Sequence, residues 1–361
     1  IDLTSFPYNT WRKVTRATLM DDDKEMFLTG SPQGEPGLRE AIRGYLHSAR
    51  GVNCTADQII IGAGSEYLMM LLTQILGTSR TIAMENPTYR QAYRVFESLG
   101  CQMKPVEMDA HGMNVRLLEE SGADIAYVMP SHQYPMGVVM PVKRRQELLS
   151  WAGRGEKRYL IEDDYDSEFR YRGKPVPALQ GMDIQGKVIY MGTFSKSIAP
   201  AIRVGYLVLP APLLAVYKRK CGFYASTVSR IDQKIIYQFL TEGHYERHLN
   251  RMRAIYKGKH DVLMSELKTL GTEFIVQGEY AGLHVLLKYR KAGMETWLVE
   301  EAAKARVGVY GISGFLIAPL ADQKEKCFST VVLGYARLNE DQIREGIRRL
   351  AAAWKCSRPC P

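Results

Sequence analysis

The stretch Met191-Gly-Thr-Phe-Ser-Lys-Ser-Ile-Ala-Pro-Ala-Ile-Arg-Val-Gly205 joins two apolar runs of this 361-residue chain. The runs, 187–191 and 204–209, have the pattern of buried strands. Lys196 is therefore expected on a tight loop in a low-dielectric place, where the charged form of its amine is disfavoured. A neutral amine there can form a Schiff base with an aldehyde. The alternative interpretation is a surface loop with a solvated lysine.

The same loop carries groups that suit a phosphate. The hydroxyls of Thr193 and Ser195 can bind phosphate oxygens, and the guanidinium of Arg203 can grip them bidentately. An amine for an aldehyde, together with donors for a phosphate, is what pyridoxal phosphate requires. The loop alone leaves both interpretations open, so a second and distant motif is needed.

That second motif, Tyr159-Leu-Ile-Glu-Asp-Asp-Tyr-Asp-Ser-Glu-Phe169, runs from a short apolar strand into a cluster of carboxylates. Ligands usually bind at the carboxyl ends of strands in α/β sheets. Asp163 is the candidate to keep a pyridine nitrogen protonated. Tyr165, two residues on, would point its hydroxyl to the same side, where it could bond the ring oxygen. The alternative is an acidic, solvated loop.

Together, Glu162–Phe169 and Gly192–Ser197 resemble the MocR/GabR group of bacterial GntR-type transcriptional regulators. The effector domain of that group is similar to fold type I, class I/II aminotransferases, and the likeness extends from about Phe6 to Leu338. The resemblance implies an α/β fold. A mostly parallel sheet would be sandwiched by helices in a large domain, followed by a smaller α+β C-terminal domain.

Apolar strands alternate with helical stretches at 64–76, 87–99 and 142–153, which independently predicts a mostly parallel sheet with helices on both faces. Three parts are expected along the chain: an N-terminal arm at 1–20, a large cofactor-binding domain at 21–245, and a long helix with the small C-terminal domain at 246–361.

The stretch Gly62-Ala-Gly-Ser-Glu-Tyr67 follows a strand and opens a helix, where backbone amides and the helix dipole favour a phosphate. A dinucleotide-binding fingerprint would need a third glycine where Tyr67 stands, so this class of site is excluded. A plain strand–helix turn is the alternative. The resemblance implies phosphate donors, mainly through the backbone, at Gly64, Ser65 and Glu66.

The resemblance also implies roles for residues elsewhere in the chain. Tyr89 would lie against the cofactor ring, and Arg337 would bind the α-carboxylate of the ligand. Tyr134 stands where aminotransferases have the asparagine that bonds the ring hydroxyl, a departure that favours the regulator group. Two further positions depart from the pattern. Gln91 replaces an arginine that some relatives use for the effector carboxylate, and Thr29 replaces an aromatic residue that reaches the neighbouring subunit's phosphate.

The composition narrows the classes of protein. The net charge of +9 is compatible with nucleic-acid binding, but the basic residues are spread through helical stretches, without a helix-turn-helix, zinc-finger or RNA-binding signature. No apolar run approaches a membrane span, and no signal peptide opens the chain. The six cysteines form no Cys-x-x-Cys, which favours reduced thiols in the cytoplasm. His244 and His248 lack the metalloprotease pattern, so no metal site is expected.

Two functional hypotheses follow. In the first, the chain is the pyridoxal phosphate-binding effector domain of a MocR-family regulator: Lys196 holds the cofactor, and an amino acid or amine displaces it as an external aldimine. In the second, the chain is a working aminotransferase, in which the freed lysine acts as general base and acid. Both hypotheses use the same residues.

The resemblance implies partners as well. A homodimer is expected, and in the resembled regulators a winged-helix DNA-binding domain and a linker precede this region. Because the chain begins at Ile1, we expect that part to be absent here, with DNA contacted only through it. The effector itself and the operator are not indicated by the sequence.

Overall fold

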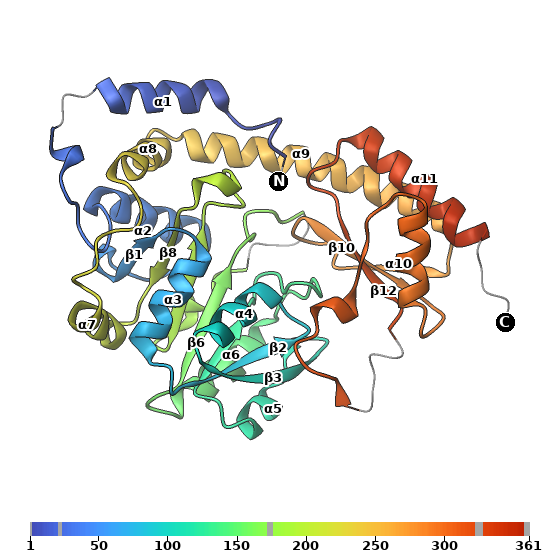
Figure 1. Cartoon of the computed structure of the whole chain (residues 1–361), viewed down its shortest axis with the longest axis horizontal. Helices are drawn as coiled ribbons and strands as arrows, with labels where there is room; N and C mark the ends of the chain where they lie inside the picture. Colours follow the sequence, from blue (N-terminus) through green and yellow to red (C-terminus); the bar gives the residue numbers. More distant parts are fainter. Residues whose placement is uncertain (1, 21–23, 172–175, 322–327, 357–361) are drawn as a thin grey trace.

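The computed structural model describes residues 2–20, 24–171, 176–321 and 328–356, so Ile1, Cys327 and Cys360 lie outside the described residues. Figure 1 shows a large layered body and a smaller one, with helix α9 running along the top from the first to the second. Among the described residues, none of the helices combines the length and the apolar character needed to cross a membrane.

The large body is built on an eight-stranded sheet with the order β1-β8-β7-β6-β5-β2-β3-β4. The pairs from β7 to β3 are parallel, whereas β8 runs antiparallel to both of its neighbours. The strands are β1 (Ile59–Gly62), β2 (Thr81–Asn86), β3 (Gln102–Asp109), β4 (Gly112–Met113), β5 (Ile125–Val128), β6 (Tyr159–Asp164), β7 (Val188–Thr193) and β8 (Gly205–Val208). The predicted mostly parallel sheet is confirmed.

Helices cover both faces of this sheet, because successive residues of a strand point to opposite sides. In β5, Ile125 and Tyr127 pack with α3, α4 and α7, while Ala126 and Val128 pack with α5 and α6 on the other face. The second face is completed by α2, α8 and the start of α9. These helices are α2 (Pro36–Arg50), α3 (Ser65–Leu76), α4 (Arg90–Ser98), α5 (Val115–Glu120), α6 (Val142–Gly153), α7 (Ala211–Lys220), α8 (Arg230–Thr241) and α9 (His244–Leu267).

The small body contains a four-stranded antiparallel sheet with the order β11-β12-β10-β9. One face packs against two helices and the C-terminal half of α9, forming a separate apolar core. Its elements are β9 (Phe274–Gln277), β10 (His284–Tyr289), α10 (Glu295–Lys304), β11 (Tyr310–Gly311), β12 (Thr330–Gly334) and α11 (Glu340–Cys356).

Helix α9 belongs to both bodies. Tyr245 and Leu249 near its start pack in the core of the large body, whereas Leu263 and Leu267 near its end pack in the core of the small one. A helix of 24 residues spans roughly 36 Å, which is long enough to join the two cores. The expected division between 245 and 246 falls in the first turn of α9 and stays a prediction.

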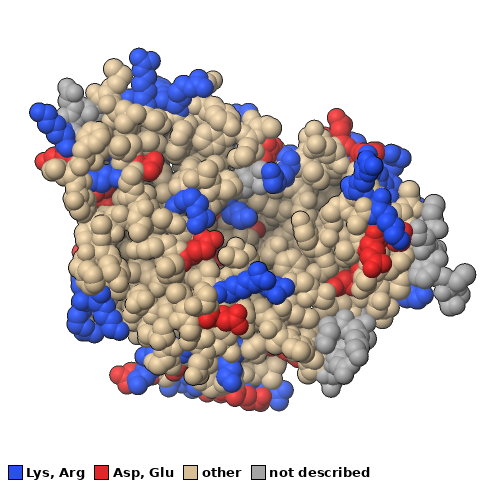
Figure 2. All heavy atoms as spheres, in the orientation of Figure 1, with Lys and Arg blue, Asp and Glu red and all other residues tan. Residues whose placement is uncertain are grey.

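The remaining elements are short or lie outside the two sheets. The N-terminal helix α1 (Tyr8–Met20) packs against α8 and is followed by chain that returns to α2 (Figure 1). The short 3-10 helices are η1 (Lys24–Phe27), η2 (Ala56–Gln58), η3 (Gln180–Met182), η4 (Pro200–Ile202), η5 (Lys268–Leu270) and η6 (Ile312–Phe315). On the face drawn in Figure 2, basic side chains are interspersed with acidic ones rather than gathered in one broad patch.

Candidate functional site

A cavity of about 320 Å³ opens where β6 and β7 end and α3 begins. It brings together residues that are up to 138 positions apart in the chain, since Ser65 and Arg203 both line it. The lining residues are Ser65, Glu66, Tyr89, Met129, Tyr134, Asp163, Tyr165, Thr193, Ser195, Lys196, Pro200 and Arg203. Ten of these twelve residues are candidates from the sequence; Met129 and Pro200 are not.

Lys196 lies on the turn between β7 and β8, as the apolar runs on either side predicted. The expectation that it occupies a low-dielectric place is wrong for the chain as described, because Lys196 is exposed. The reason is that its side chain stands at the junction of two cavities, the one above and a larger cleft beneath the small body. An amine in this position is open to a ligand from either side.

Asp163 is the buried acid of the cavity, with 7% of its surface exposed. The hydroxyl of Tyr127 donates a hydrogen bond to its Oδ2 atom. Burial raises the pKa of Asp163 to about 7, against the lowering effects of the Tyr127 bond and the Lys196 charge. A buried carboxyl group with a raised pKa is suited to pair with a cation or a protonated ring nitrogen.

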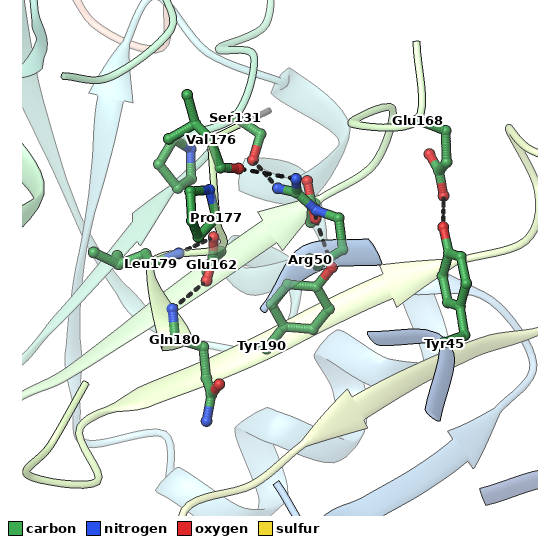
Figure 3. A network of polar contacts seen from close by, with 12 residues as sticks. Tyr45, Arg50, Ser131, Glu162, Glu168, Val176, Pro177, Leu179, Gln180 and Tyr190 are labelled. Carbon is green, nitrogen blue, oxygen red and sulfur yellow. Dashed lines mark hydrogen bonds and ion pairs between the residues drawn. The ribbon is translucent and has the colours of Figure 1, made fainter. Parts of the chain in front are cut away.

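The neighbouring acids of β6 point to the opposite face of the sheet, as the period of two requires. Asp164 accepts hydrogen bonds from Arg50 Nε at 2.8 Å and from the Tyr190 hydroxyl at 2.5 Å. Glu162 accepts from the backbone N–H groups of Leu179 and Gln180, at 2.7 and 2.8 Å (Figure 3). These acids are therefore buried and hydrogen-bonded, and they do not form a solvated loop. Their hydrogen bonds hold the end of β6 on the face of the sheet opposite Asp163.

The other end of the cavity has the features of an anion site. Gly64 precedes α3 with φ at +88°, and a Cβ atom placed there would lie 2.5 Å from Nη2 of Arg203, so only glycine lets the guanidinium approach. Arg203 itself has a φ of 51°, in the left-handed region that non-glycine residues seldom adopt. Arg203 Nη2 pairs with the carboxylate of Glu66 at 2.6 Å. The sequence predicted the backbone of Glu66 as a donor, but it did not predict this side-chain pair.

Hydroxyl groups line the side of the cavity between these two ends. The Ser195 N–H donates to Oγ1 of Thr193 at 3.1 Å, which holds the loop of Lys196 closed. Tyr165 Oη lies 3.1 Å from Nδ1 of His132, and the same nitrogen lies 2.9 Å from Oδ2 of Asp166. His132 is buried, so this chain of contacts sets the position of the Tyr165 ring.

Aromatic rings enclose the middle of the cavity. Tyr134 makes edge contacts with Tyr89 and Tyr165, at ring-centre separations of 6.1 and 6.3 Å. Tyr134 also contacts His284 of the small body, at 5.1 Å between ring centres. The three tyrosines therefore form one aromatic side of the cavity. The expected contact of Tyr89 with a cofactor ring stays a prediction.

Arg337 does not line this cavity. It lines the larger cleft of about 740 Å³ between the two bodies, into which Tyr134, Tyr165 and Lys196 also reach. Lys196 is therefore one of three residues, with Tyr134 and Tyr165, that line both spaces. The departing positions Thr29 and Gln91 are exposed and line neither of the two spaces.

Replacing Asp163 with asparagine should change how stability depends on pH. The pKa of Asp163 rises from near 4 in the unfolded chain to about 7 in the folded one, so between these values the folded chain binds more protons. This acid therefore stabilises the fold at low pH, and its contribution is lost as pH rises through about 7. The Asp163→Asn variant should lose less stability than the wild type between about pH 4 and pH 7, as measured by thermal unfolding of the cofactor-free protein.

The comparison between variants is needed because His284 acts in the opposite direction. Burial lowers the pKa of His284 to about 3, so its contribution to stability rises with pH until the unfolded histidine loses its proton. Glu156→Gln, an exposed change outside the site, is the matched control. Identical pH profiles for Asp163→Asn and the wild type would contradict the raised pKa.

The chain matches the model of the family described as aminotransferase class I and II, over residues 3–350. It is 39% identical to the HTH-type transcriptional regulator YdeL of Bacillus subtilis, covering 98% of this chain and 75% of that protein. It is 30% identical to the probable rhizopine catabolism regulatory protein MocR of Rhizobium meliloti, covering 98% and 71%. Among solved structures, the multiple substrate aminotransferase of Thermococcus profundus has a TM-score of 0.85 and 26% identity, covering 98% of this chain and 89% of that one.

The chain therefore belongs to the aminotransferase class I and II family, in the group represented by MocR-type regulators. The resemblance seen in the sequence and the predicted fold type I architecture are confirmed. Members of this family use pyridoxal phosphate. The residues present fit that group, since a buried carboxyl group faces the cavity at one end and Gly64 and Arg203 form an anion cradle at the other.

Proposed function

We propose that this chain is the pyridoxal phosphate-binding sensor part of a transcriptional regulator, and that it binds an amino acid or amine as its effector. The observation that carries this proposal is the position of Lys196, at the junction of the cavity containing Asp163 and the cleft containing Arg337. When bound, pyridoxal phosphate supplies an aldehyde that bonds covalently to an amine, and a ring that withdraws electrons from it.

In this proposal, one end of the cavity binds the cofactor ring and the other end binds its phosphate. Asp163 keeps the ring nitrogen protonated, Tyr127 and the strand β6 hold Asp163 in place, and Lys196 carries the aldehyde carbon. Tyr89 lies against the cofactor ring, and Tyr134 and Tyr165 contact the ring oxygen. The residues assigned to the phosphate are Gly64, Ser65, Glu66, Thr193, Ser195 and Arg203, with Glu66 acting through its backbone.

The effector enters from the cleft. Lys196 would release the cofactor to the amino group of the effector, and the guanidinium of Arg337 would bind the effector carboxylate, a pairing for which arginine is well suited. Binding shifts the protein only if the ligand contacts one arrangement of the two bodies better than the other.

A polar contact links the cleft to the start of the chain. Lys259 Nζ on α9 donates to the carbonyl oxygen of Ala336 at 3.0 Å and pairs with the Asp2 carboxylate at 2.8 Å. Both partners of this ion pair are nearly buried, with side-chain exposures of 7% and 10%. Because Ala336 precedes Arg337, a movement of Arg337 on ligand binding can be passed to the N-terminal segment. This contact supports a sensor whose DNA-binding part is attached at that end.

A working aminotransferase is the second candidate. The observation that favours it is the open position of Lys196, which lets the freed amine reach a bound ligand and move a proton as general base and acid. Likeness over most of this chain, at 28% identity, to the aromatic-amino-acid aminotransferase 1 of Thermococcus litoralis agrees with it. A homodimer is proposed in both cases, from the family resemblance.

The two functions are separated by adding amino acids and amines, one at a time, to the cofactor-loaded protein. A sensor is expected to give a change in visible absorbance with a particular ligand that then stays constant, without release of a 2-oxo acid. Conversion of the cofactor to its amine form, with release of the oxo acid and turnover on a second oxo acid, would establish the enzyme instead. Absence of any spectral change across the panel would contradict both functions.

A further inference from the structure

The cleft that contains Arg337 carries an excess of positive charge. Among the residues that the structure describes, four basic side chains line it, Lys196, Arg306, Arg337 and Arg349, against two acidic ones, Asp166 and Glu345. Two of these bases already have a task in the proposed function, Lys196 for the cofactor and Arg337 for the effector's α-carboxylate. Arg306 and Arg349 have none.

The two acids do not cancel this excess. Asp166 is 3% exposed and is held by Nδ1 of His132 at 2.9 Å. Glu345 receives Nε and Nη2 of Arg348 at 2.7 and 2.8 Å, and Nε of Arg349 at 2.7 Å. Arg348 by itself neutralises Glu345, and it is not among the residues lining the cleft. Arg349 engages Glu345 through Nε, and it is itself one of the residues that line the cleft.

Arg306 is held in a backbone conformation that glycine normally adopts. It follows α10 with a φ of 59°, its N–H donates to Ala303 O at 2.9 Å, and the N–H of Val307 donates to Ala302 O at 2.9 Å. Such left-handed residues at the ends of helices are usually glycine, because a Cβ atom is strained there. A positive charge at the C-terminal end of a helix is stabilised by the helix dipole. A lysine or arginine inside the last turn would be stabilised as much, without the backbone strain, so the dipole alone does not explain an arginine at position 306.

We propose that the cleft selects amino acids that carry a second anionic group at their far end, with Arg337 binding the α-carboxylate and Arg306 and Arg349 binding the distal anion. This inference rests on the proposed function and specifies its effector class. Two guanidinium groups favour a planar, bidentate anion such as a carboxylate over a neutral amide. An amino acid of the same length that lacks the second negative charge would form no ion pair with Arg306 or Arg349.

The test uses pairs of amino acids that differ only in their end group. Aspartate and asparagine, then glutamate and glutamine, are titrated into the cofactor-loaded protein, and affinity is measured from the cofactor absorbance and independently by calorimetry. The acidic member of at least one pair is expected to bind about tenfold more tightly or better, which corresponds to one charge-assisted contact. Equal binding of both members in each pair, or preference for the amides, would overturn the inference while leaving the proposed sensor intact.

Variants show whether the preference arises from these residues. Arg306→Gly removes the guanidinium and relieves the strained backbone, so the protein should keep or raise its thermal stability while losing most of the preference for the acid. Affinity for the amide should fall by less than affinity for the acid. Arg344→Ala is the matched control and should keep the preference, because Arg344 is an arginine of the same helix α11 that pairs with Glu266 and Glu340 and does not line the cleft. An undiminished preference in Arg306→Gly, or no spectral response to any amino acid in the wild type, would overturn the assignment, and the second result would contradict the proposed function as well.

Discussion

Replacing Lys196 with alanine is expected to abolish the absorbance band of the lysine–cofactor imine, since none of the other lysines that the structure describes lines the cavity that contains Asp163. The cofactor should still bind through Arg203 and Asp163, with the spectrum of the free aldehyde. The fold should be retained, because Lys196 is exposed and surface substitutions of this kind usually change stability by less than about 0.5 kcal/mol. Absorbance spectroscopy of the reconstituted variant measures the first effect, and thermal unfolding measures the second.

Lys218→Ala is the matched control, because Lys218 is an exposed lysine on α7, away from the cavity. This variant should give the wild-type spectrum. A visible band of normal intensity in Lys196→Ala would mean that another amine holds the cofactor, and the roles assigned around Lys196 would have to be withdrawn.

Opposite changes in cofactor affinity are expected from the two partners of the Arg203–Glu66 ion pair. Arg203→Ala removes a guanidinium from the proposed phosphate site, and loss of one charge-assisted contact should weaken binding by about 2 kcal/mol, or roughly 30-fold. Glu66→Gln removes the carboxylate that lies 2.6 Å from the guanidinium and competes with a phosphate for it, so binding should become tighter. Equilibrium titration of the cofactor-free variants, followed by absorbance, measures both.

The contrast between the two variants is more informative than either alone. A general disturbance of the loop would weaken binding in both, whereas competition for one guanidinium predicts a change of opposite sign. Unchanged affinity in Arg203→Ala would show that the backbone at the start of α3 and the hydroxyls of Thr193 and Ser195 hold the phosphate without it.

The parts of the fold that depend on local pattern could be predicted from the sequence. The apolar runs at 187–191 and 204–209 were expected as strands and form most of β7 and β8, because strands buried on both faces are apolar throughout. Strands near the edge of the sheet could not be predicted in this way. In β3, half-exposed on the edge side of the sheet, polar and apolar residues are mixed, so Gln102–Asp109 has no clear pattern.

Most of the candidate site could also be predicted, because its residues follow strand ends. The groups that support it could not. Tyr127 is hidden inside an apolar strand, and Arg50 meets Asp164 across 114 positions of sequence, which no spacing indicates. The exposure of Lys196 depends on how the small body stands over β7 and β8, and the loop sequence does not contain that information.

The central claim is that Lys196 bonds covalently to pyridoxal phosphate. Treating the cofactor-loaded wild-type protein with borohydride makes an imine bond permanent, and peptide mass spectrometry then locates the attached group. We predict that the phosphopyridoxyl group is found on Lys196, in the peptide from the β7–β8 loop. In Asp163→Asn, less cofactor should be retained, but it should still be attached to Lys196. Attachment at a different lysine, or a wild-type protein that carries no group after reduction, would contradict the account.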